Sequence, residues 1–163
     1  MASLVYILTG SNMGNSLENL ELASSRIHES CGKIIQKSSV YKTAAWGNTS
    51  QNAFLNQVIC IETALGPQEL LTNLLFIETQ MGRVRNEKWE PRVIDIDILF
   101  YDTLQLNEPN LILPHLFIQQ RRFTLIPLVE IAPQLVHPVL QQSMIILLNQ
   151  CEDELMVEKL DVK

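Results

Sequence analysis

Two aspartates separated by a single residue have the clearest chemical potential in the chain. Asp95 and Asp97 lie in an apolar run, residues 93–101, that predicts a strand. Alternate strand residues share a face, so the two carboxylates are expected roughly 6.6 Å apart. At that separation they repel by about 2.5 kcal/mol at an effective dielectric of about 20. A divalent cation would reverse this cost, and Mg²⁺ prefers such oxygen ligands. The alternative is a solvated edge-strand face without a function.

A dense group of cations precedes the aspartates. It comprises Arg83, Arg85, Lys88 and Arg92, in a segment with neither helical nor strand periodicity. Guanidinium groups make paired hydrogen bonds to phosphate oxygens and stabilise charge on a transferring group. The sequence therefore predicts that metal ligands and phosphate-binding cations meet at one place, and a salt-bridged surface loop is the alternative. Trp89, within the same segment, could cover a flat heterocycle or pack against the sheet.

A second polar cluster follows the strand. Pro114-His115 and Arg121-Arg122-Phe123 supply an imidazole, two cations and an aromatic ring within a short span. His115 could donate to a phosphate oxygen, and the alternative is a turn residue beside proline. Two cation groups in an otherwise acidic chain favour a small polyanion as ligand.

The glycine-containing segment Gly10-Ser11-Asn12-Met13-Gly14 superficially resembles a phosphate-binding loop. It has neither the lysine of a Walker loop nor the glycine pattern of a dinucleotide-binding loop. We therefore expect a tight turn close to the site. His28 and His137 have no evident partners in the sequence, and no role is predicted for them.

Composition narrows the class of protein. A chain of 163 residues fits one domain, residues 1–163. The net charge of −6 argues against a general nucleic-acid-binding surface. No apolar stretch approaches the roughly 18 residues of a membrane span, and no basic segment precedes the first apolar run as in a signal peptide. A cytoplasmic protein is expected, and a monomer is the default. Three widely spaced cysteines predict free thiols.

Hydrophobic periodicity and turn residues predict the elements that must position these side chains. The expected strands cover residues 4–9, 34–41, 54–63 and 93–101, and the expected helices cover residues 15–31 and 66–80. The order βαββαβ is that of a ferredoxin-like α+β fold, an antiparallel sheet with two helices on one face. A C-terminal extension is expected to add helices near residues 122–131 and 143–150 and an edge strand near residues 155–160.

A series of short motifs runs along essentially the whole chain. The motifs are Gly10-Ser11-Asn12, Tyr41-Lys42-Thr43, Phe54-Leu55-Asn56, Glu78, Gly82-Arg83-Val84-Arg85, Trp89, Pro91-Arg92, Asp95-Ile96-Asp97, Pro114-His115, Arg121, Phe123 and Pro127-Leu128. In this combination the chain resembles the 6-hydroxymethyl-7,8-dihydropterin pyrophosphokinases of folate biosynthesis. The resemblance implies a ferredoxin-like enzyme that transfers pyrophosphate from ATP to the hydroxymethyl group of the pterin and releases AMP.

The resemblance also implies a role for each matching residue. Asp95 and Asp97 would coordinate two Mg²⁺ ions, and Arg83 and Arg92 would assist the transfer. ATP would be bound by Glu78, Arg85, Lys88, Ile98, His115 and Arg121. The pterin would be bound by Thr43, Trp46, Phe54, Asn56, Trp89 and Phe123, with its ring between the two phenylalanines. Loops around the two tryptophans would close over the substrates and exclude water.

Several positions depart from the common pattern of the family. Ala44-Ala45 replaces a proline-containing stretch, Lys88 replaces a frequent arginine, Leu75 replaces a polar helix residue and Leu116 replaces an aromatic residue. ATP affinity is therefore the property that transfers least directly. An RNA-binding module of the same fold would need strand aromatics and a basic face, and neither is visible. A nucleotide sensor that has lost pterin turnover is the other alternative, and pterin-dependent AMP release would distinguish it from the enzyme.

Overall fold

The computed structural model of the chain describes residues 2–44, 53–83 and 92–161. The strands are β1 (Ser3–Ser11), β2 (Lys33–Lys37), β3 (Tyr41–Thr43), β4 (Phe54–Thr63), β5 (Asp95–Tyr101), β6 (Leu106–Glu108), β7 (Leu111–Leu113) and β8 (Val157–Lys159). The helices are α1 (Ser16–Ser30), α2 (Pro67–Gln80), α3 (Arg122–Ile131) and α4 (Met144–Gln150), with a 3-10 turn, η1 (Ile118–Gln120), before α3.

The main sheet confirms the predicted ferredoxin-like α+β fold. Its order is β5-β1-β4-β3-β8, with β2 also paired to β4, and the described pairs are antiparallel. The strand predicted over residues 34–41 is instead two strands, β2 and β3, which both pair with β4 and are separated by residues 38–40. Ser38, between the two strands, pairs with Val58 through its backbone N–H, and its hydroxyl oxygen accepts the Val58 N–H.

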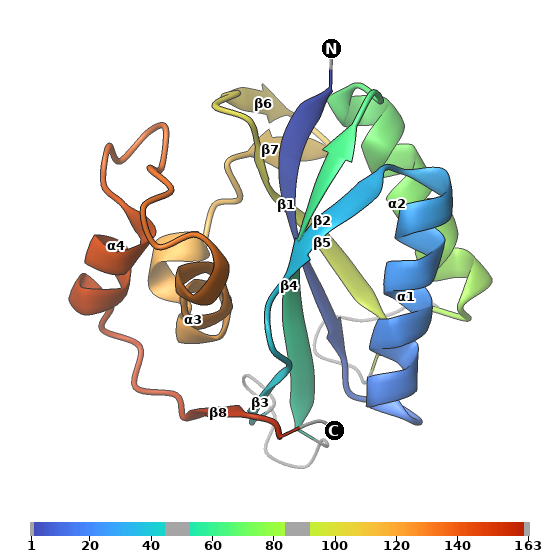
Figure 1. The fold of residues 1–163 in the computed structure, drawn as a ribbon, viewed down its shortest axis with the longest axis horizontal. Helices are drawn as coiled ribbons and strands as arrows, with labels where there is room; N and C mark the ends of the chain where they lie inside the picture. The colour runs from blue at the N-terminus through green and yellow to red at the C-terminus, as the bar shows by residue number, and fades with distance from the viewer. Residues whose placement is uncertain (1, 45–52, 84–91, 162–163) are drawn as a thin grey trace.

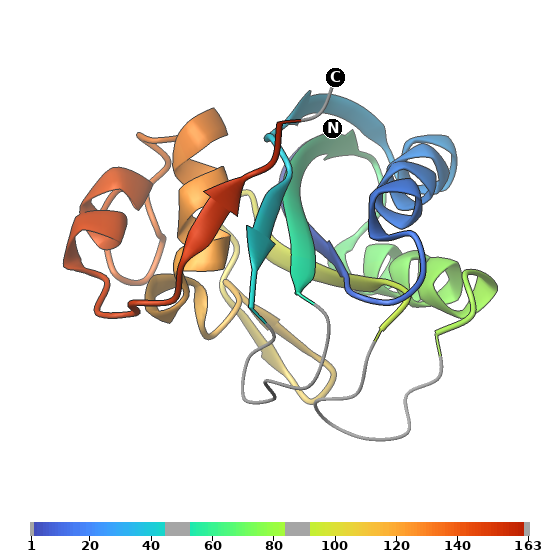
Figure 2. The ribbon, with the colours of Figure 1, turned by 90° about the horizontal axis from the view of Figure 1, so that it is seen from below.

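Helices cover both faces of the sheet, so the fold has three layers, with the sheet in the middle (Figure 1 and Figure 2). Apolar side chains of α1 and α2, including Leu20 and Leu74, pack with Val5 of β1 in one core. Leu125 of α3 and Met144 of α4 pack in a second core on the opposite face. Full burial of such a side chain stabilises the fold by roughly 1.5–3 kcal/mol. The prediction of two helices on one face is confirmed for α1 and α2, and the C-terminal extension supplies the third layer.

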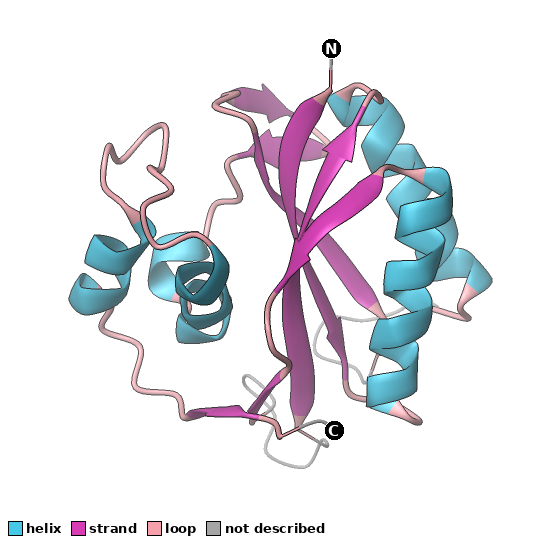
Figure 3. Cartoon of the chain, in the orientation of Figure 1, coloured by secondary structure: helices cyan, strands magenta, loops and turns pink. Residues whose placement is uncertain are grey.

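The C-terminal extension also adds strands (Figure 3). The edge strand predicted over residues 155–160 is confirmed as β8, which pairs with β3. Glu130 of α3 accepts hydrogen bonds from the Ser39 N–H, the Ser39 hydroxyl and the Tyr41 hydroxyl, so it fastens α3 to the start of β3. The hairpin of β6 and β7 was not predicted, because its three-residue strands are too short to show an alternating pattern.

Two observations concern the cysteines and the membrane. Cys31 and Cys60 are buried, Cys151 is partly exposed, and all three are unpaired, which confirms the prediction of free thiols. Among the helices of the described residues, none has both the length and the apolar character needed to cross a bilayer.

Candidate active site

Strand register places two groups of predicted site residues on one face of the sheet. Gly10 pairs with Asp95 on β5 and with Asn56 on β4, so the three form one row across the strands. Leu8 pairs with Asp97 and belongs to the core beneath α3. Paired residues of antiparallel strands point to the same face. Both aspartates and Asn56 therefore face the side of the sheet that α3 covers.

The two aspartates have different surroundings. Asp95 accepts hydrogen bonds from Arg83 at 2.7 Å and from Arg92 at 3.0 Å. No hydrogen-bond donor among residues 2–44, 53–83 and 92–161 is within reach of the Asp97 carboxylate. Removal from water and the negative charges of Asp95 and Glu78 raise the pKa of Asp97 to about 7. Asp97 is therefore a carboxylate that a bound cation would stabilise.

The binding of Mg²⁺ by Asp95 and Asp97 stays a prediction. Within the part of the chain that the structure describes, no group of three or more His, Cys, Asp or Glu side chains could hold a metal ion. We expect a cation at Asp95 and Asp97 to take its other ligands from water or from a bound phosphate. Mg²⁺ commonly binds in this way, through one or two carboxylates and substrate phosphates.

The end of α2 brings Arg83 to Asp95. Gly82 has a φ of +93°, and its N–H donates to the Thr79 carbonyl while the Arg83 N–H donates to the Glu78 carbonyl. This Schellman motif ends the helix and turns the chain back. The Arg83 guanidinium then donates to the Glu78 carboxylate at 2.8 Å, and that carboxylate also accepts the Ile96 N–H at 2.7 Å.

Glu78 is therefore a link between α2, Arg83 and β5. Its side chain is 2% exposed; its hydrogen bond to Ile96 is buried, and its hydrogen bond to Arg83 is partly buried. A buried carboxylate with these partners holds the guanidinium in a fixed direction. We expect Glu78 to act on the site by positioning Arg83, and its direct contact with ATP stays a prediction.

Asn12 holds the other arginine in place. Its N–H donates to the Arg92 carbonyl at 3.1 Å, and its side-chain oxygen accepts the Arg92 N–H at 2.7 Å. No role was predicted for Asn12. Its position at the end of an apolar strand was the available signal, because asparagine there often bonds nearby backbone. The turn expected from Gly10 onward begins later, since Gly10 and Ser11 are part of β1.

His115 lies beside β5 and is held in one tautomer. Its backbone N–H donates to the Leu99 carbonyl at 3.0 Å, and its ring Nδ1 accepts the Phe117 backbone N–H at 3.3 Å. A ring that accepts at Nδ1 keeps its proton on Nε2, which can then donate to a ligand. Burial, and then the positive charge of Arg121, lower the pKa of His115 to about 4. His115 is therefore a neutral hydrogen-bond donor at pH 7.

We predict that His115 titrates far below the ordinary histidine range. Since the unfolded chain takes up this proton near pH 6.5 and the folded chain near pH 4, this group reduces stability as the pH falls between these values. The imidazole carbon resonances measured by NMR between pH 3.5 and 8, with His115→Gln for assignment, should give a midpoint close to 4. A midpoint near 6.5 would contradict the neutral-donor assignment.

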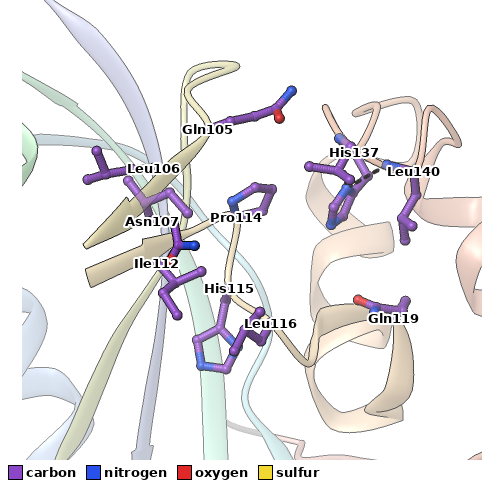
Figure 4. Close-up of a pocket in the computed structure, with 12 residues that line it drawn as sticks. Gln105, Leu106, Asn107, Ile112, Pro114, His115, Leu116, Gln119, His137 and Leu140 are labelled. Atoms are coloured by element: carbon purple, nitrogen blue, oxygen red, sulfur yellow. Dashed lines mark hydrogen bonds between the residues drawn. The ribbon is translucent and has the colours of Figure 1, made fainter. Parts of the chain in front are cut away.

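An open groove of about 430 Å³ lies next to His115 (Figure 4). Its described lining consists of Gln105, Leu106, Asn107, Ile112, Leu113, Pro114, His115, Leu116, Gln119, His137, Val139 and Leu140. Lys, Arg, Asp and Glu are absent from that described lining. A triphosphate needs cations, so we expect it on the side of His115 where Arg121 and Asp95 lie. His137 has a structural role, because its Nδ1 accepts the Val139 and Leu140 N–H groups.

The first turn of α3 presents a cation and an aromatic ring. The guanidinium carbon of Arg121 lies 5.5 Å from the centre of the Phe123 ring and 4.9 Å from that of Phe117. The Asp153 carboxylate accepts the Arg122 N–H and so caps the helix from the C-terminal segment. These contacts fix Arg121 and Phe123 relative to each other.

The hairpin of β3 and β4 carries the residues predicted to bind the pterin. Thr43 pairs with Phe54, and the Asn56 amide donates to the Thr43 hydroxyl at 3.4 Å. Thr43 and Asn56 are buried, while Phe54 is partly exposed. A polar pair beside an aromatic ring suits the edge and the face of a flat heterocycle.

Some of the predicted site residues lie outside the described residues or face away from the site. Trp46, Arg85, Lys88 and Trp89 lie outside the described residues, and their roles stay predictions. The Ile98 side chain is 4% exposed and packs in the core with α1 and α2, so it cannot reach a ligand. A contact of Ile98 with ATP would have to use its backbone at the sheet edge. Among the departures from the family pattern, the side chains of Leu75 and Leu116 are exposed.

The fold and the site define a ferredoxin-like α+β protein with carboxylates and arginines suited to a metal-bound polyphosphate. The model of the family described as 7,8-dihydro-6-hydroxymethylpterin-pyrophosphokinase (HPPK) matches residues 6–133. The chain belongs to this family.

Similar proteins cover most of the chain. It is 44% identical over 132 residues to the 2-amino-4-hydroxy-6-hydroxymethyldihydropteridine pyrophosphokinase of Methylorubrum extorquens, which covers 80% of this chain and 84% of that protein. It is 39% identical over 140 residues to the protein of the same name from Aquifex aeolicus, and this match covers 86% of this chain and 87% of that protein. Plasmodium falciparum HPPK-DHPS matches its structure with a TM-score of 0.75 at 17% identity, over 92% of this chain and 45% of that one, and this likeness shows the fold alone.

Proposed function

We propose that the chain transfers a pyrophosphoryl group from ATP to the hydroxymethyl group of 6-hydroxymethyl-7,8-dihydropterin, as a cytosolic monomer in folate biosynthesis. The names of its relatives support this reaction. The observation that carries the proposal is the carboxylate of Asp97, which no hydrogen-bond donor of the described residues reaches and which lies close to Asp95 on the same sheet face as Asn56. In this proposal, one face of the sheet would hold a metal-bound phosphate beside a heterocycle.

Asp95 and Asp97 are the proposed ligands of two Mg²⁺ ions that bind with ATP. When bound, Mg²⁺ would neutralise charge on the phosphate oxygens and orient them. The two arginines on Asp95 then have different tasks. Arg83 is 8% exposed and is also bound to Glu78, so it positions Asp95. Arg92 is 26% exposed and can turn toward the transferring group.

The remaining residues position the two substrates. His115 donates a hydrogen bond from Nε2 to the triphosphate, and the positive charge of Arg121 attracts the phosphate oxygens. Asn56 and Thr43 bond the edge of the pterin, whose ring lies against Phe54. The hydroxymethyl oxygen attacks the β-phosphorus and its proton passes to water, while the bond from that phosphorus to the oxygen shared with the α-phosphate breaks and AMP leaves with that oxygen. Catalysis then consists mainly of positioning and charge stabilisation.

A nucleotide assay tests the proposed function. We expect AMP to appear when the protein is mixed with ATP, Mg²⁺ and 6-hydroxymethyl-7,8-dihydropterin, and to be absent when any one of these is omitted or when EDTA removes the metal. Chromatography of the nucleotides, with mass spectrometry of the pterin product, gives the answer. ATP that binds but stays intact with all components present would support the nucleotide-sensor alternative.

A further inference from the structure

Gly10 lies in the middle of the proposed site. It is the residue of β1 that pairs with Asp95 on one side and Asn56 on the other. Neighbouring strands lie roughly 4.8 Å apart, so the backbones of Asp95 and Asn56 are separated by about 9.6 Å. A pterin held at its edge by Asn56 must extend its hydroxymethyl group across Gly10 to reach the carboxylate of Asp95.

The absence of a side chain at Gly10 has a steric reason. A Cβ atom at this position would lie 2.6 Å from Oδ1 of Asn56 and 3.7 Å from its Cγ. Gly10 is an ordinary strand residue, and the glycines with positive φ among those described are Gly14 and Gly82. Glycine inside a strand often marks a close approach of another group. At Gly10 the approaching group is the amide of Asn56.

We propose that Gly10 is a positioning residue that determines where the Asn56 amide meets the pterin and keeps the space between this amide and Asp95 open. The inference rests on the proposed function and assigns a role to a residue outside the predicted ligand contacts. A side chain at Gly10 would displace the amide, which also donates to the Thr43 hydroxyl. The atoms nearest to the added Cβ belong to β4, so the effect should fall on the pterin and spare ATP.

The test compares Gly10→Ala with Gly66→Ala. Gly66 precedes α2, and a Cβ there would meet no atom within 4 Å. Since the Asn56 bond to the pterin is lost or misaligned, Gly10→Ala should raise KM for the pterin about tenfold or more, leaving KM for ATP within about twofold. Gly66→Ala should change neither. Equal KM values for the pterin in Gly10→Ala and wild type would overturn the inference.

A double-mutant cycle separates positioning from damage to β1. In an Asn56→Ser background the atom that the new Cβ would meet is absent, so Gly10→Ala should cause no further loss of pterin affinity. The same loss in both backgrounds would overturn the inference, because it would show a general effect on the strand. A crystal structure of Gly10→Ala with the Asn56 amide unmoved would overturn it as well.

Pterin fluorescence gives a dissociation constant without turnover, measured with Mg²⁺ and a non-hydrolysable ATP analogue. If wild type binds the pterin but releases no AMP, the proposed function fails, and the ratio of the dissociation constants of Gly10→Ala and wild type still decides the role of Gly10. A tenfold weaker Gly10→Ala supports the inference, and equal affinity overturns it. Wild type that binds no pterin would overturn both proposals.

Discussion

Asp97→Asn is expected to lower kcat by about a thousandfold or more while the protein remains folded. The substitution keeps the size of the side chain but removes one of the two carboxylates proposed to hold Mg²⁺. Metal ions in such sites contribute several kcal/mol to stabilisation of the transition state, and about 4 kcal/mol corresponds to a factor of a thousand. The measurement is the rate of AMP formation at saturating ATP, pterin and Mg²⁺.

The stability of the same variant gives an independent readout. Asp97 has no described hydrogen-bond donor, and the negative charges of Asp95 and Glu78 oppose its ionisation. In EDTA, the melting temperature of Asp97→Asn should therefore equal or exceed that of wild type. Asp161→Asn, the same chemical change at an exposed position, should leave the rate unchanged. Near-normal turnover of Asp97→Asn would show that this carboxylate is not a metal ligand.

Elements with complete local signals could be predicted from the sequence. The strand over residues 54–63 and the helix from Gly66-Pro67 to Gln80 agree with β4 and α2, because proline begins the helix and Gly82 follows its end. The pairing of β1 with β5 puts Asp95 and Asp97 on one face, which the alternating pattern had indicated. At these positions, the residues of the element and its immediate neighbours were sufficient to predict the structure.

The rest depended on contacts between distant segments. Ser38 interrupts the predicted strand because its hydroxyl accepts the N–H of Val58, twenty residues away. Asp95 and Asp97 look equivalent in the sequence, and their difference arises because Arg83 and Arg92 converge on Asp95 alone. No periodicity records such a choice of partner, since it depends on how α2 and β5 meet in space.

Substitutions of Arg83 and Arg92 are expected to have different effects on the free energy of unfolding, although the sequence predicted one role for both residues. Arg83 and Glu78 are 8% and 2% exposed, and their charges are paired at 2.8 Å. Removing one partner of a buried pair typically costs about 3–5 kcal/mol, so Arg83→Met should lower the free energy of unfolding by that amount. Arg92 is 26% exposed, and Arg92→Met should cost under about 1 kcal/mol. Urea unfolding of both variants measures the difference.

A second substitution, Glu78→Gln, tests whether the stability lost in Arg83→Met is due to the buried charge left without its partner. Glu78→Gln removes the buried negative charge but keeps a side-chain oxygen that can accept the Ile96 N–H. The double variant Glu78→Gln/Arg83→Met should therefore be more stable than Arg83→Met alone, because a neutral amide needs no cation beside it. If Arg83→Met is as stable as Arg92→Met, or if Glu78→Gln brings no recovery, the buried pair does not hold α2 against β5. Recovery of stability without recovery of turnover would show that Asp95 also depends on the Arg83 guanidinium for its position.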